Sequence, residues 1–434
     1  MRMAANLGLR PLLFSVVLAC TPHVDHPRGH GTASPLTVEI GGPIRGIASD
    51  GGRMFVARGS KLEARVLGGK AELAWNLDTP GVPGPMIYAD GAVVATVMGH
   101  GPVTTFGPAF ELRGEPSGVV VALDPATGKV TWRVPFVSNE FAVITTIAPI
   151  VAGKNGSQGI VVGGTFSGTL RVGDAANRVT DRDVVASAGR TDGFVALLGS
   201  DGSLKWVVRM GGLYADAVQG VAARNDRIAI AGTLMATAEL LGEPLDPIDD
   251  KVPLADAFVA ELDLAGTRRW SQTFGSPKQE DAIAGVAIDS EQRIAVAATV
   301  RGAVKIGDRT VTAKGEADGL VAYWAPGGQL LSATLLGTDA FDGLRSIAPV
   351  DDRVVVAGYS GNLAFVVDVD AKGAQGTAHP FSGAGREDVT ALNALPGGFI
   401  AAVGHTANAE IDGSDVPAPA EPTAGAAVIV RPAP

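Results

Sequence analysis

The chain has little of what most metal and redox sites are made from. Its 434 residues include one cysteine and six histidines, and aromatic residues make up only 5%. A single cysteine excludes an intramolecular disulfide and every zinc site that needs two thiolates. From the sequence we therefore predict no metal site and no cofactor, and we assign no catalytic residue.

Charge is also scarce, and it has an acidic excess. Charged residues make up 18% of the chain, and the formal net charge is −10. Proteins that bind nucleic acid present a positive face to the phosphates, and the sequence has no cluster of Lys and Arg from which to build one. Nucleic acid is therefore excluded as an expected partner.

The N-terminal 19 residues predict an export signal. After a short start with two arginines, an apolar run covers Pro11–Ala19. The run is too short to cross a bilayer as a helix, but it fits the apolar region of a secretory signal peptide. It ends in Val17-Leu-Ala-Cys20, which resembles the bacterial lipobox, although Leu is commoner than Val at the first of these positions.

The lipobox resemblance implies that the peptide is cut before Cys20 and that this residue is acylated. Several acyl chains would hold the protein on a membrane almost permanently. Thr21 rather than Asp follows the cysteine, which by resemblance to lipoprotein sorting favours the outer membrane of a bacterium with two membranes. The alternative is a plain signal peptide with a buried cysteine nearby. We favour lipidation, because the only cysteine occupies the one position that the lipobox requires.

Residues 20–35 are predicted to form a flexible tether, since they are polar, contain Pro and Gly, and have no apolar period. Half of the histidines, His23, His26 and His30, lie here. Nothing in the segment would orient them around a metal, so we interpret it as a solvated tether. The folded domain is expected to span residues 36–434.

That domain is rich in glycine and consists of a recurring unit of short apolar strands. In the copy at Ala255–Gly302, an apolar strand is followed by a turn, a second strand and a hairpin. Relatives of the first strand lie at Lys61–Val66, Gly118–Asp124, Asp192–Leu198, Asp256–Leu262, Asp318–Trp324, Leu363–Val369 and Gly425–Val430. The hairpin recurs seven times, at Ile44–Ala57, Met86–Gly99, Ile144–Gly164, Val218–Gly232, Ile283–Ala298, Leu344–Gly358 and Val389–Gly404.

A tryptophan keeps a fixed place in several copies. Trp132, Trp206 and Trp270 each follow the centre of the first strand by 12 residues, and Trp75 has a similar place after Gly68-Gly69. A side chain of this size recurring in register is expected to pack between neighbouring sheets. Later copies have Ser332 and Thr377 instead.

An aspartate recurs just before the first strand, as Asp192, Asp256 and Asp318. Because a functional residue is more often unique than repeated, we predict a structural role for it, capping a turn or holding a neighbouring strand.

The fold class predicted from these repeats is all-β, a single β-propeller of seven four-stranded blades. The 399 residues from Leu36 to Pro434 would give about 57 residues per unit. The chain begins with a hairpin and ends with an isolated strand, so we expect the C-terminal strand to pair with the N-terminal hairpin and close the ring. Six or eight blades remain open, because the units before Gly118 are degenerate. Segments after three hairpins, including Phe166–Gly173 and Val300–Gly307, are interpreted as a fourth, edge strand.

The units resemble the seven-bladed propeller repeat known as SBBP, whose pattern is Asp-Ala-Phe-Val-Ala, a turn, Trp, Gly and a hairpin ending in Val-x-Gly. The resemblance covers most of Gly118–Gly404, and Val119–Trp132 is instead similar to the quinoprotein-type repeat. Quinoprotein dehydrogenases typically need a Glu, Asn and Asp site for calcium or a lanthanide, and many have a vicinal cysteine pair. Enzymatic use of the quinone is therefore not expected here.

Two remaining groups of residues were weighed as sites. His100, His379 and His405 fall in different units and have no assignable partner, so each is interpreted as a loop or channel-rim residue. The insertion Gly242–Lys251 has four acids, Glu243, Asp246, Asp249 and Asp250, whose oxygens suit calcium. It matches no EF-hand spacing and contains prolines, so we interpret it as a surface loop and leave the calcium site open.

Two functions from different classes follow. The first is a membrane-tethered binding or scaffold module in the bacterial envelope, anchored through Cys20 and presenting one face to a protein, peptide or glycan. The alternative is an envelope enzyme, a hydrolase, lyase or oxidoreductase with its site in the central channel. A third, weaker possibility is structural packing in the envelope without a ligand. We assemble no cluster of unique polar residues from the sequence, so binding is preferred and catalysis is not predicted.

Overall fold

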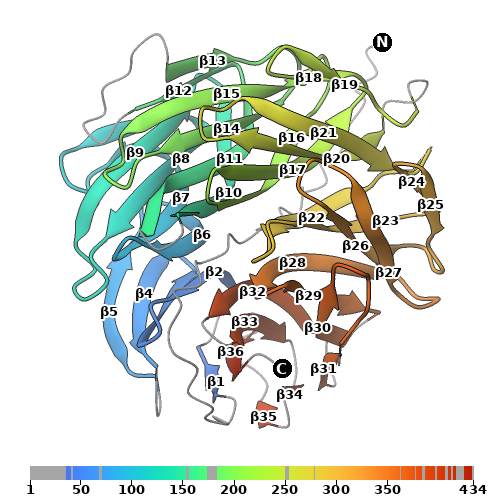
Figure 1. Cartoon of the computed structure of the whole chain (residues 1–434). Helices are drawn as coiled ribbons and strands as arrows, with labels where there is room; N and C mark the ends of the chain where they lie inside the picture. The colour runs from blue at the N-terminus through green and yellow to red at the C-terminus, as the bar shows by residue number, and fades with distance from the viewer. Residues whose placement is uncertain are drawn as a thin grey trace, which may run out of the picture.

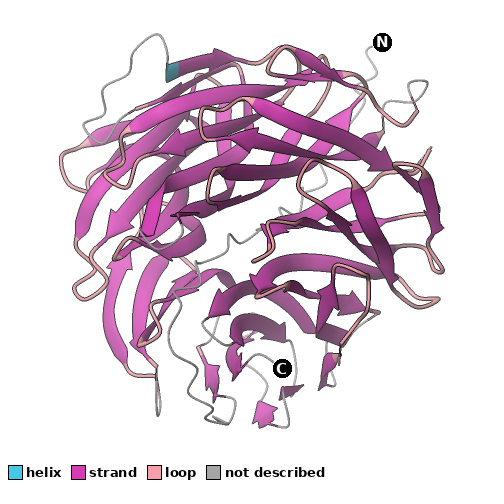
Figure 2. Ribbon diagram, in the orientation of Figure 1, coloured by secondary structure: helices cyan, strands magenta, loops and turns pink. Residues whose placement is uncertain are grey.

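The computed structural model in Figure 1 shows an all-β molecule whose colours pass in sequence order around a ring. It describes residues 36–40, 43–67, 71–152, 156–173, 183–249, 254–277, 279–361, 363–376, 378–383, 387–395, 398–405, 409–411, 414–416 and 425–432. Strands make up its regular structure almost entirely (Figure 2). Among the described residues, no helix has the length and apolarity to span a membrane. The predicted signal peptide, Cys20 and the tether lie outside them.

The strands form seven antiparallel blades, as predicted. Among the described residues, each blade has four core strands in order from inner to outer, and the seven predicted hairpins are the first two strands of each. The first three blades are β2 (Ile44–Ser49), β3 (Arg53–Arg58), β4 (Lys61–Val66) and β5 (Leu73–Asp78); β6 (Val82–Ala89), β7 (Ala92–Val103), β8 (Phe110–Leu123) and β9 (Val130–Ser138); and β10 (Phe141–Ala152), β11 (Gly156–Ser167), β14 (Asp192–Leu198) and β15 (Leu204–Gly212). The next three are β16 (Ala217–Arg224), β17 (Arg227–Met235), β20 (Ala255–Asp263) and β21 (Arg268–Gly275); β22 (Ala282–Ile288), β23 (Ile294–Val300), β26 (Asp318–Trp324) and β27 (Leu330–Leu336); and β28 (Asp342–Val350), β29 (Arg353–Ser360), β30 (Leu363–Asp370) and β31 (His379–Gly383).

Blade 7 joins the two ends of the folded domain. Its strands are β32 (Glu387–Leu395), β33 (Gly398–His405), β36 (Gly425–Pro432) and, outermost, β1 (Leu36–Glu39). The predicted partner of the C-terminal strand was therefore wrong: β36 pairs with β1 and not with the hairpin, which belongs to blade 1. The reason is that the hairpin already pairs within its own blade, and the short strand before it is left to complete blade 7.

The inner strands lie next to one another around the ring. Each contacts the inner strands of both neighbouring blades, and β32 of blade 7 contacts β2 of blade 1. There the Asn393 side chain donates to the carbonyl oxygen of Ile47 at 3.0 Å. All seven inner strands have a register shift near their start, and such bulges bend a strand and increase its twist.

Four blades have six strands instead of four. The extra hairpins are β12 (Thr169–Val172) with β13 (Val184–Ala186), β18 (Ala238–Leu240) with β19 (Glu243–Leu245), β24 (Ala303–Ile306) with β25 (Arg309–Thr312), and β34 (Ala409–Ile411) with β35 (Ser414–Val416). Each hairpin connects the second and third strands of one blade but pairs with the outer strand of the preceding blade. The interpretation of these segments as a fourth strand was therefore wrong. They cover an edge of the neighbouring sheet that would otherwise be open.

The recurring tryptophans pack between blades, as predicted. The indole N–H groups of Trp132 and Trp206 donate to carbonyl oxygens in the next blade, Ser200 O and Leu264 O, both at 2.9 Å. The Trp132 ring of blade 2 also packs against Gly202, which lies in the turn of blade 3. A Cβ added at Gly202 would lie 2.8 Å from this ring. Between blades 5 and 6 a smaller side chain makes the equivalent contact. The Thr334 hydroxyl of blade 5 donates to the carbonyl oxygen of Gly373 in blade 6 at 3.3 Å.

The antiparallel order gives the ring two different faces. The connections from strand 1 to 2 and from strand 3 to 4 lie together on one face, which we call the turn face. The connections from strand 2 to 3 and from strand 4 to the next blade lie on the other, which we call the crossover face.

Candidate functional site

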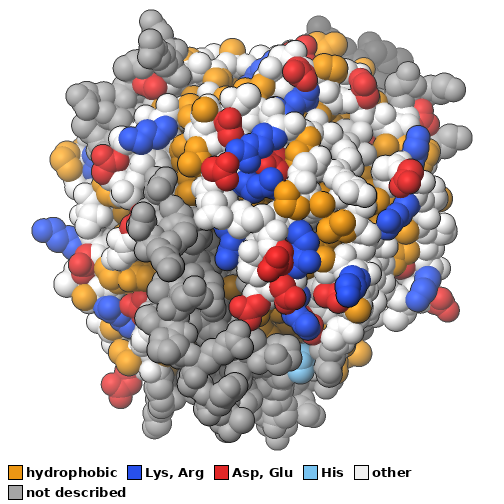
Figure 3. Space-filling view, in the orientation of Figure 1, with side chains coloured by type: hydrophobic (Ala, Val, Ile, Leu, Met, Phe, Trp, Pro, Cys, Tyr) orange, Lys and Arg blue, Asp and Glu red, His pale blue; other side chains and the backbone are white. Residues whose placement is uncertain are grey.

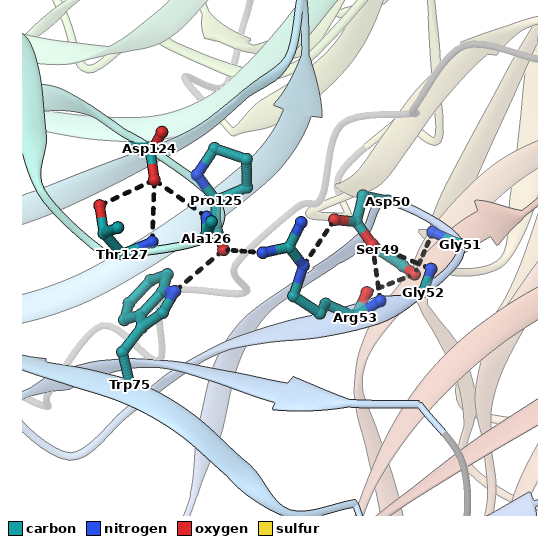
Figure 4. Close-up of polar contacts among 10 residues, drawn as sticks. All are labelled: Ser49, Asp50, Gly51, Gly52, Arg53, Trp75, Asp124, Pro125, Ala126 and Thr127. Atoms are coloured by element: carbon teal, nitrogen blue, oxygen red, sulfur yellow. Dashed lines mark hydrogen bonds and ion pairs between the residues drawn. The ribbon is translucent and has the colours of Figure 1, made fainter.

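On the turn face, polar side chains join one blade to the next. Figure 4 shows Arg53 and Trp75 of blade 1 both donating to the carbonyl oxygen of Pro125 in blade 2, at 2.7 and 3.0 Å. Asp50 holds the Arg53 guanidinium at 2.9 Å, and Asp124 accepts hydrogen bonds from the backbone of its own turn. These polar groups are occupied by the frame itself, which makes this site structural.

A buried ion-pair network also lies beside the turn face. The Glu261 carboxylate is fully buried in blade 4 and accepts from Arg227 and Arg269 at 3.0 Å and from the Trp270 indole at 2.8 Å. Asp226 contacts the same Arg269 guanidinium at 2.6 Å. A buried carboxylate needs this number of donors to offset its loss of hydration.

On the crossover face, the predicted aspartates have the structural role assigned to them. Asp192, Asp256 and Asp318 are buried at the start of the third strand. Their carboxylates accept backbone N–H groups of Ala188, Ile248 and Lys314 at 2.7 to 2.9 Å. Each therefore fixes the connection that leads into its own strand.

A second set of aspartates was missed. Asp216, Asp281 and Asp342 are buried at or next to the start of the inner strand in blades 4 to 6. They accept backbone N–H groups of the connection from the preceding blade: Gly212 at 2.7 Å, Ser276 at 2.8 Å, and Thr338. All three aspartates lie at the same place in their units, three residues before the bulge of the inner strand. This shared position was the signal that could have identified them.

The two sets meet in pairs between blades. A Cβ on Gly275 would lie 2.6 Å from an oxygen of Asp256 and 2.7 Å from one of Asp281, so the two carboxyl groups flank this glycine. Burial, with a smaller contribution from the nearby Asp256, raises the pKa of Asp281 to about 7 against the opposing effect of its backbone hydrogen bonds. Burial also raises the pKa of Asp216 to about 6. These carboxyl groups hold connections in place.

The crossover face also has a stack of rings and guanidinium groups, which we call the cation–aromatic ladder. Phe341 and Tyr359 of blade 6 stack with ring centroids 6.0 Å apart. The Arg301 guanidinium of blade 5 lies 5.5 Å from the Phe341 centroid, and that of Arg345 lies 4.7 Å from the Tyr359 centroid. Arg345 also pairs with Asp388 of blade 7 at 3.5 Å. The ladder therefore joins three blades, from the second-to-third-strand connection of blade 5 to the inner strand of blade 7.

The outer part of the ladder is accessible and its inner part is fixed. Phe341 is 39% exposed, whereas Tyr359 is 8% exposed. The loop that carries Phe341 is held by the buried Asp342. An accessible ring on a fixed base, with a guanidinium beside it, is able to bind a partner without prior ordering.

Most of the exposed large apolar residues lie on the same face. In the connection between blades 3 and 4, Leu213 is 75% exposed and Tyr214 is also exposed, as are Val82 and Leu363 at the starts of β6 and β30. In the view of Figure 3, acidic and basic side chains alternate over the described surface and apolar ones are scattered among them. The described surface seen in this view therefore presents mixed charge and not a large field of one sign.

The other candidates do not form sites in the described part of the chain. His100 lies in blade 2, His379 in blade 6 and His405 in blade 7, so the structure does not bring them together as one site. In the acidic insertion, Glu243 belongs to β19 and pairs with Arg268, while Asp250 lies outside the described residues. Among the residues that are described, no three or more His, Cys, Asp or Glu are grouped so that they would hold a metal.

Comparisons with known proteins bear on the fold. No family model matches the chain, and no curated protein matches it in sequence. It is similar to the solved structure of BamB from Moraxella catarrhalis, at 13% identity over 77% of this chain and 84% of that chain with a TM-score of 0.36. It is similar to Saccharomyces cerevisiae Sqt1, at 9% identity over 92% and 98% with a TM-score of 0.46.

It is also similar to the quinohemoprotein alcohol dehydrogenase ADHIIG from Pseudomonas putida HK5, at 12% identity and a TM-score of 0.43. That alignment covers 89% of this chain but spans only 66% of the dehydrogenase, just under two thirds. At such identities and TM-scores, the likeness says nothing about a site or an activity. The assignment of the chain as a seven-bladed β-propeller rests on the strand pairing of its described residues.

Proposed function

We propose that the chain is an exported, lipid-anchored β-propeller that binds a partner protein through its crossover face. The observation that carries this proposal is the cation–aromatic ladder, in which the accessible Phe341 ring lies between the Arg301 guanidinium and the buried Tyr359 ring. Protein interfaces are enriched in aromatic residues and arginine at their centres, and these residues supply most of the binding energy. The ladder offers this chemistry in a fixed arrangement.

A lipid anchor at Cys20 would leave the crossover face of the propeller free to meet a partner. A tether of about 15 residues after Cys20 would have a root-mean-square length of roughly 20 Å if it behaves as a flexible coil. The propeller would then stand close to the membrane while remaining free to turn either face toward a partner. A partner in the same membrane would meet the propeller at a raised effective concentration.

No observation on the described residues specifically favours the alternative that the chain is an enzyme. The two carboxyl groups whose pKa is raised most clearly into the neutral range, Asp216 and Asp281, accept backbone N–H groups that hold connections. A carboxyl group engaged in this way is poorly placed to move a proton at a substrate. Both lie in seams between blades, each in a buried pair.

Site-directed photo-cross-linking in intact cells tests the proposal. A photoreactive phenylalanine analogue replaces Phe341 in one strain and Leu73, a 47% exposed residue of the turn face, in the control strain. We expect a discrete cross-linked protein only from position 341, and its loss when Arg301 and Arg345 are both changed to Gln. Equal cross-linking from both positions, or none from position 341, would contradict the assignment of the face.

The anchor is tested separately with Cys20→Ser. Fractionation of wild-type cells should place the protein in membranes, and the variant should be released from them. A wild-type protein that is absent from membranes would overturn the lipid anchor and leave the crossover-face assignment to the cross-linking result.

A further inference from the structure

The outer edges of the seven blades are protected unequally. Among the described strands, the outer strand of blades 2, 3, 4 and 6 pairs with a hairpin from the next blade, whereas the outer strand of blades 1, 5 and 7 ends the sheet. An outer strand without a partner presents backbone N–H and C=O groups that another strand can pair with. The three open edges are therefore the places where this fold is able to extend by one strand.

Blade 5 has the least protected of these edges. Its outer strand β27 has seven residues, Leu-Leu-Ser-Ala-Thr-Leu-Leu, with neither charge nor proline. By contrast, β1 has four residues and ends in Glu39, and β5 ends in Asp78, which pairs with Lys61 at 2.8 Å. Charge and shortness are the usual means by which sheet edges avoid pairing, and β27 has neither.

The open edge has a clear structural origin. The hairpin that would cover β27 would come from the connection between the second and third strands of blade 6. That connection is a short turn, because β29 ends at Ser360 and β30 begins at Leu363. Blade 4, whose edge is covered, instead receives a long connection from blade 5 that contains β24 and β25.

The side chains beside this edge remain partly accessible. Leu330, Leu331, Ala333 and Leu335 are half-buried, and they cover the apolar clusters of the neighbouring blades. The carbonyl oxygen of Leu331 already accepts a hydrogen bond from the Arg309 guanidinium of β25 at 3.1 Å, so a strand that docks here has to displace this side chain. A strand that docked here would bury these leucines further as well as pair with the backbone.

The sequence of β27 is close to a palindrome centred on Ala333. Reversing it places Leu330 on Leu336, Leu331 on Leu335 and Ser332 on Thr334. A twofold interface must be complementary to itself, and two antiparallel copies of this strand would set leucine opposite leucine and hydroxyl opposite hydroxyl. Such cross-strand pairs are favourable, and no pair in this register brings like charges together.

We propose that β27 pairs antiparallel with β27 of a second copy of this chain, about a twofold axis at Ala333, so that two blade 5 sheets become continuous. One strand pair buries less than the roughly 1,000 Å² of a stable interface, so the dimer is weak in solution, with a dissociation constant on the order of micromolar or above. Confinement of both copies to one membrane would favour it. The pairing itself does not depend on the anchor or on the crossover face.

Cysteine cross-linking of the full-length chain tests the pairing and its register. In a Cys20→Ser background, Ala333→Cys places two thiols opposite each other across the axis, at a Cβ separation of about 5 Å. Mild oxidation should convert most of this variant into a disulfide-linked dimer. The matched control is Ala74→Cys on β5, the other long open edge, which should remain largely monomeric.

A mixture of Leu331→Cys and Leu335→Cys chains sharpens the test. In the proposed register these two positions face each other across the axis, so the mixture should cross-link several-fold more than either variant alone. Efficient cross-linking of Ala333→Cys together with concentration-dependent dimerisation of the Cys20→Ser protein in sedimentation experiments would support the pairing. Failure of Ala333→Cys to exceed the Ala74→Cys control, in a variant that keeps the parent circular dichroism spectrum, would overturn it.

Discussion

The turn face and the crossover face use aspartate in opposite ways. On the turn face, the pKa values of Asp124, Asp201 and Asp226 are lowered, chiefly by side-chain hydrogen bonds from Thr127, Ser203 and Arg269. On the crossover face, the pKa values of Asp216, Asp256 and Asp281 are raised, chiefly by burial. The ionised form is therefore favoured for these three turn-face carboxylates, whereas the three crossover-face carboxyl groups are buried at a cost near neutral pH.

This difference shows how a repeated unit provides two surfaces with separate tasks. The turn-face contacts repeat from blade to blade, since an indole or an arginine of one blade meets the turn of the next. The cation–aromatic ladder occurs at blades 5 to 7 and combines residues that do not follow the repeat. Repetition is typical of a frame, and departure from it is where recognition is expected.

Breaking the turn-face frame should have the largest effect on stability. Glu261→Ala leaves Arg227 and Arg269 beside a cavity and removes the acceptor of the Trp270 indole. We expect the free energy of unfolding to fall by about 3–5 kcal/mol, because the partners of a removed buried charge lose their compensation. Urea unfolding followed by tryptophan fluorescence measures it.

The control for this variant is Asp352→Ala, since Asp352 is largely exposed and lies 4.0 Å from its arginine. It should change the free energy of unfolding by no more than about 0.5 kcal/mol. Similar losses in the two variants would show that the buried network does not carry the frame.

The opposite pKa shifts on the two faces predict opposite pH dependences. The folded-state pKa of Asp281, about 7, exceeds the unfolded value of about 3.9, so the folded state binds the extra proton between these pH values. Stability should therefore rise as the pH falls from 7 to 4, by about 2–4 kcal/mol from this group. Asp281→Asn should flatten the profile in this window.

Asp124→Asn is the matched control on the turn face. Its folded-state pKa is lowered, so its contribution is fully present above the unfolded value and is lost only as the pH falls below about 4. Its profile between pH 4 and 7 should follow that of the parent. A parent profile that is flat or rises with pH in this window would contradict the burial of protonatable carboxyl groups at the crossover face.

The frame could be predicted from the sequence because its residues repeat. The seven hairpins, the tryptophans and Asp192 with its relatives each recur at the same place within a unit, and such recurrence reports a shared place in the blade. Asp216 and its relatives were missed although they repeat, because each connection before them has a different sequence and length.

The remaining features depend on contacts between blades, which spacing does not encode. The outer hairpins pair with the preceding blade, so assigning them from their own unit placed them wrongly. The ladder brings Arg301 and Phe341, from two separate connections, next to Arg345 of the inner strand β28. Neither an aromatic residue nor an arginine in a polar connection distinguishes such a site in the sequence.

A smaller effect isolates the contact between a tryptophan and the next turn. Gly202 has a φ of +78°, and a Cβ there would lie 2.8 Å from the Trp132 ring. We expect Gly202→Ala to lower the free energy of unfolding by about 2 kcal/mol, from backbone strain and displacement of the indole. Gly51→Ala separates the two causes, because Gly51 has a φ of +88° but nothing within 4 Å of the added Cβ. It should cost only about 1 kcal/mol, and equal losses would remove the indole from the explanation.

The smallest effect on stability is expected at the crossover face, where Phe341→Ala removes a ring that is 39% exposed. The loop should keep its place, because Asp342 holds it through the backbone and side chain of Thr338. The free energy of unfolding should change by no more than about 0.5–1 kcal/mol, while cross-linking from a neighbouring position such as Asp339 should fall to background. Gly202→Ala is the converse control, since it should weaken the fold but leave this cross-linking intact in the folded fraction. If Phe341→Ala instead destabilised the protein as much as Gly202→Ala, the ladder would belong to the frame, and the contrast between the two faces would disappear.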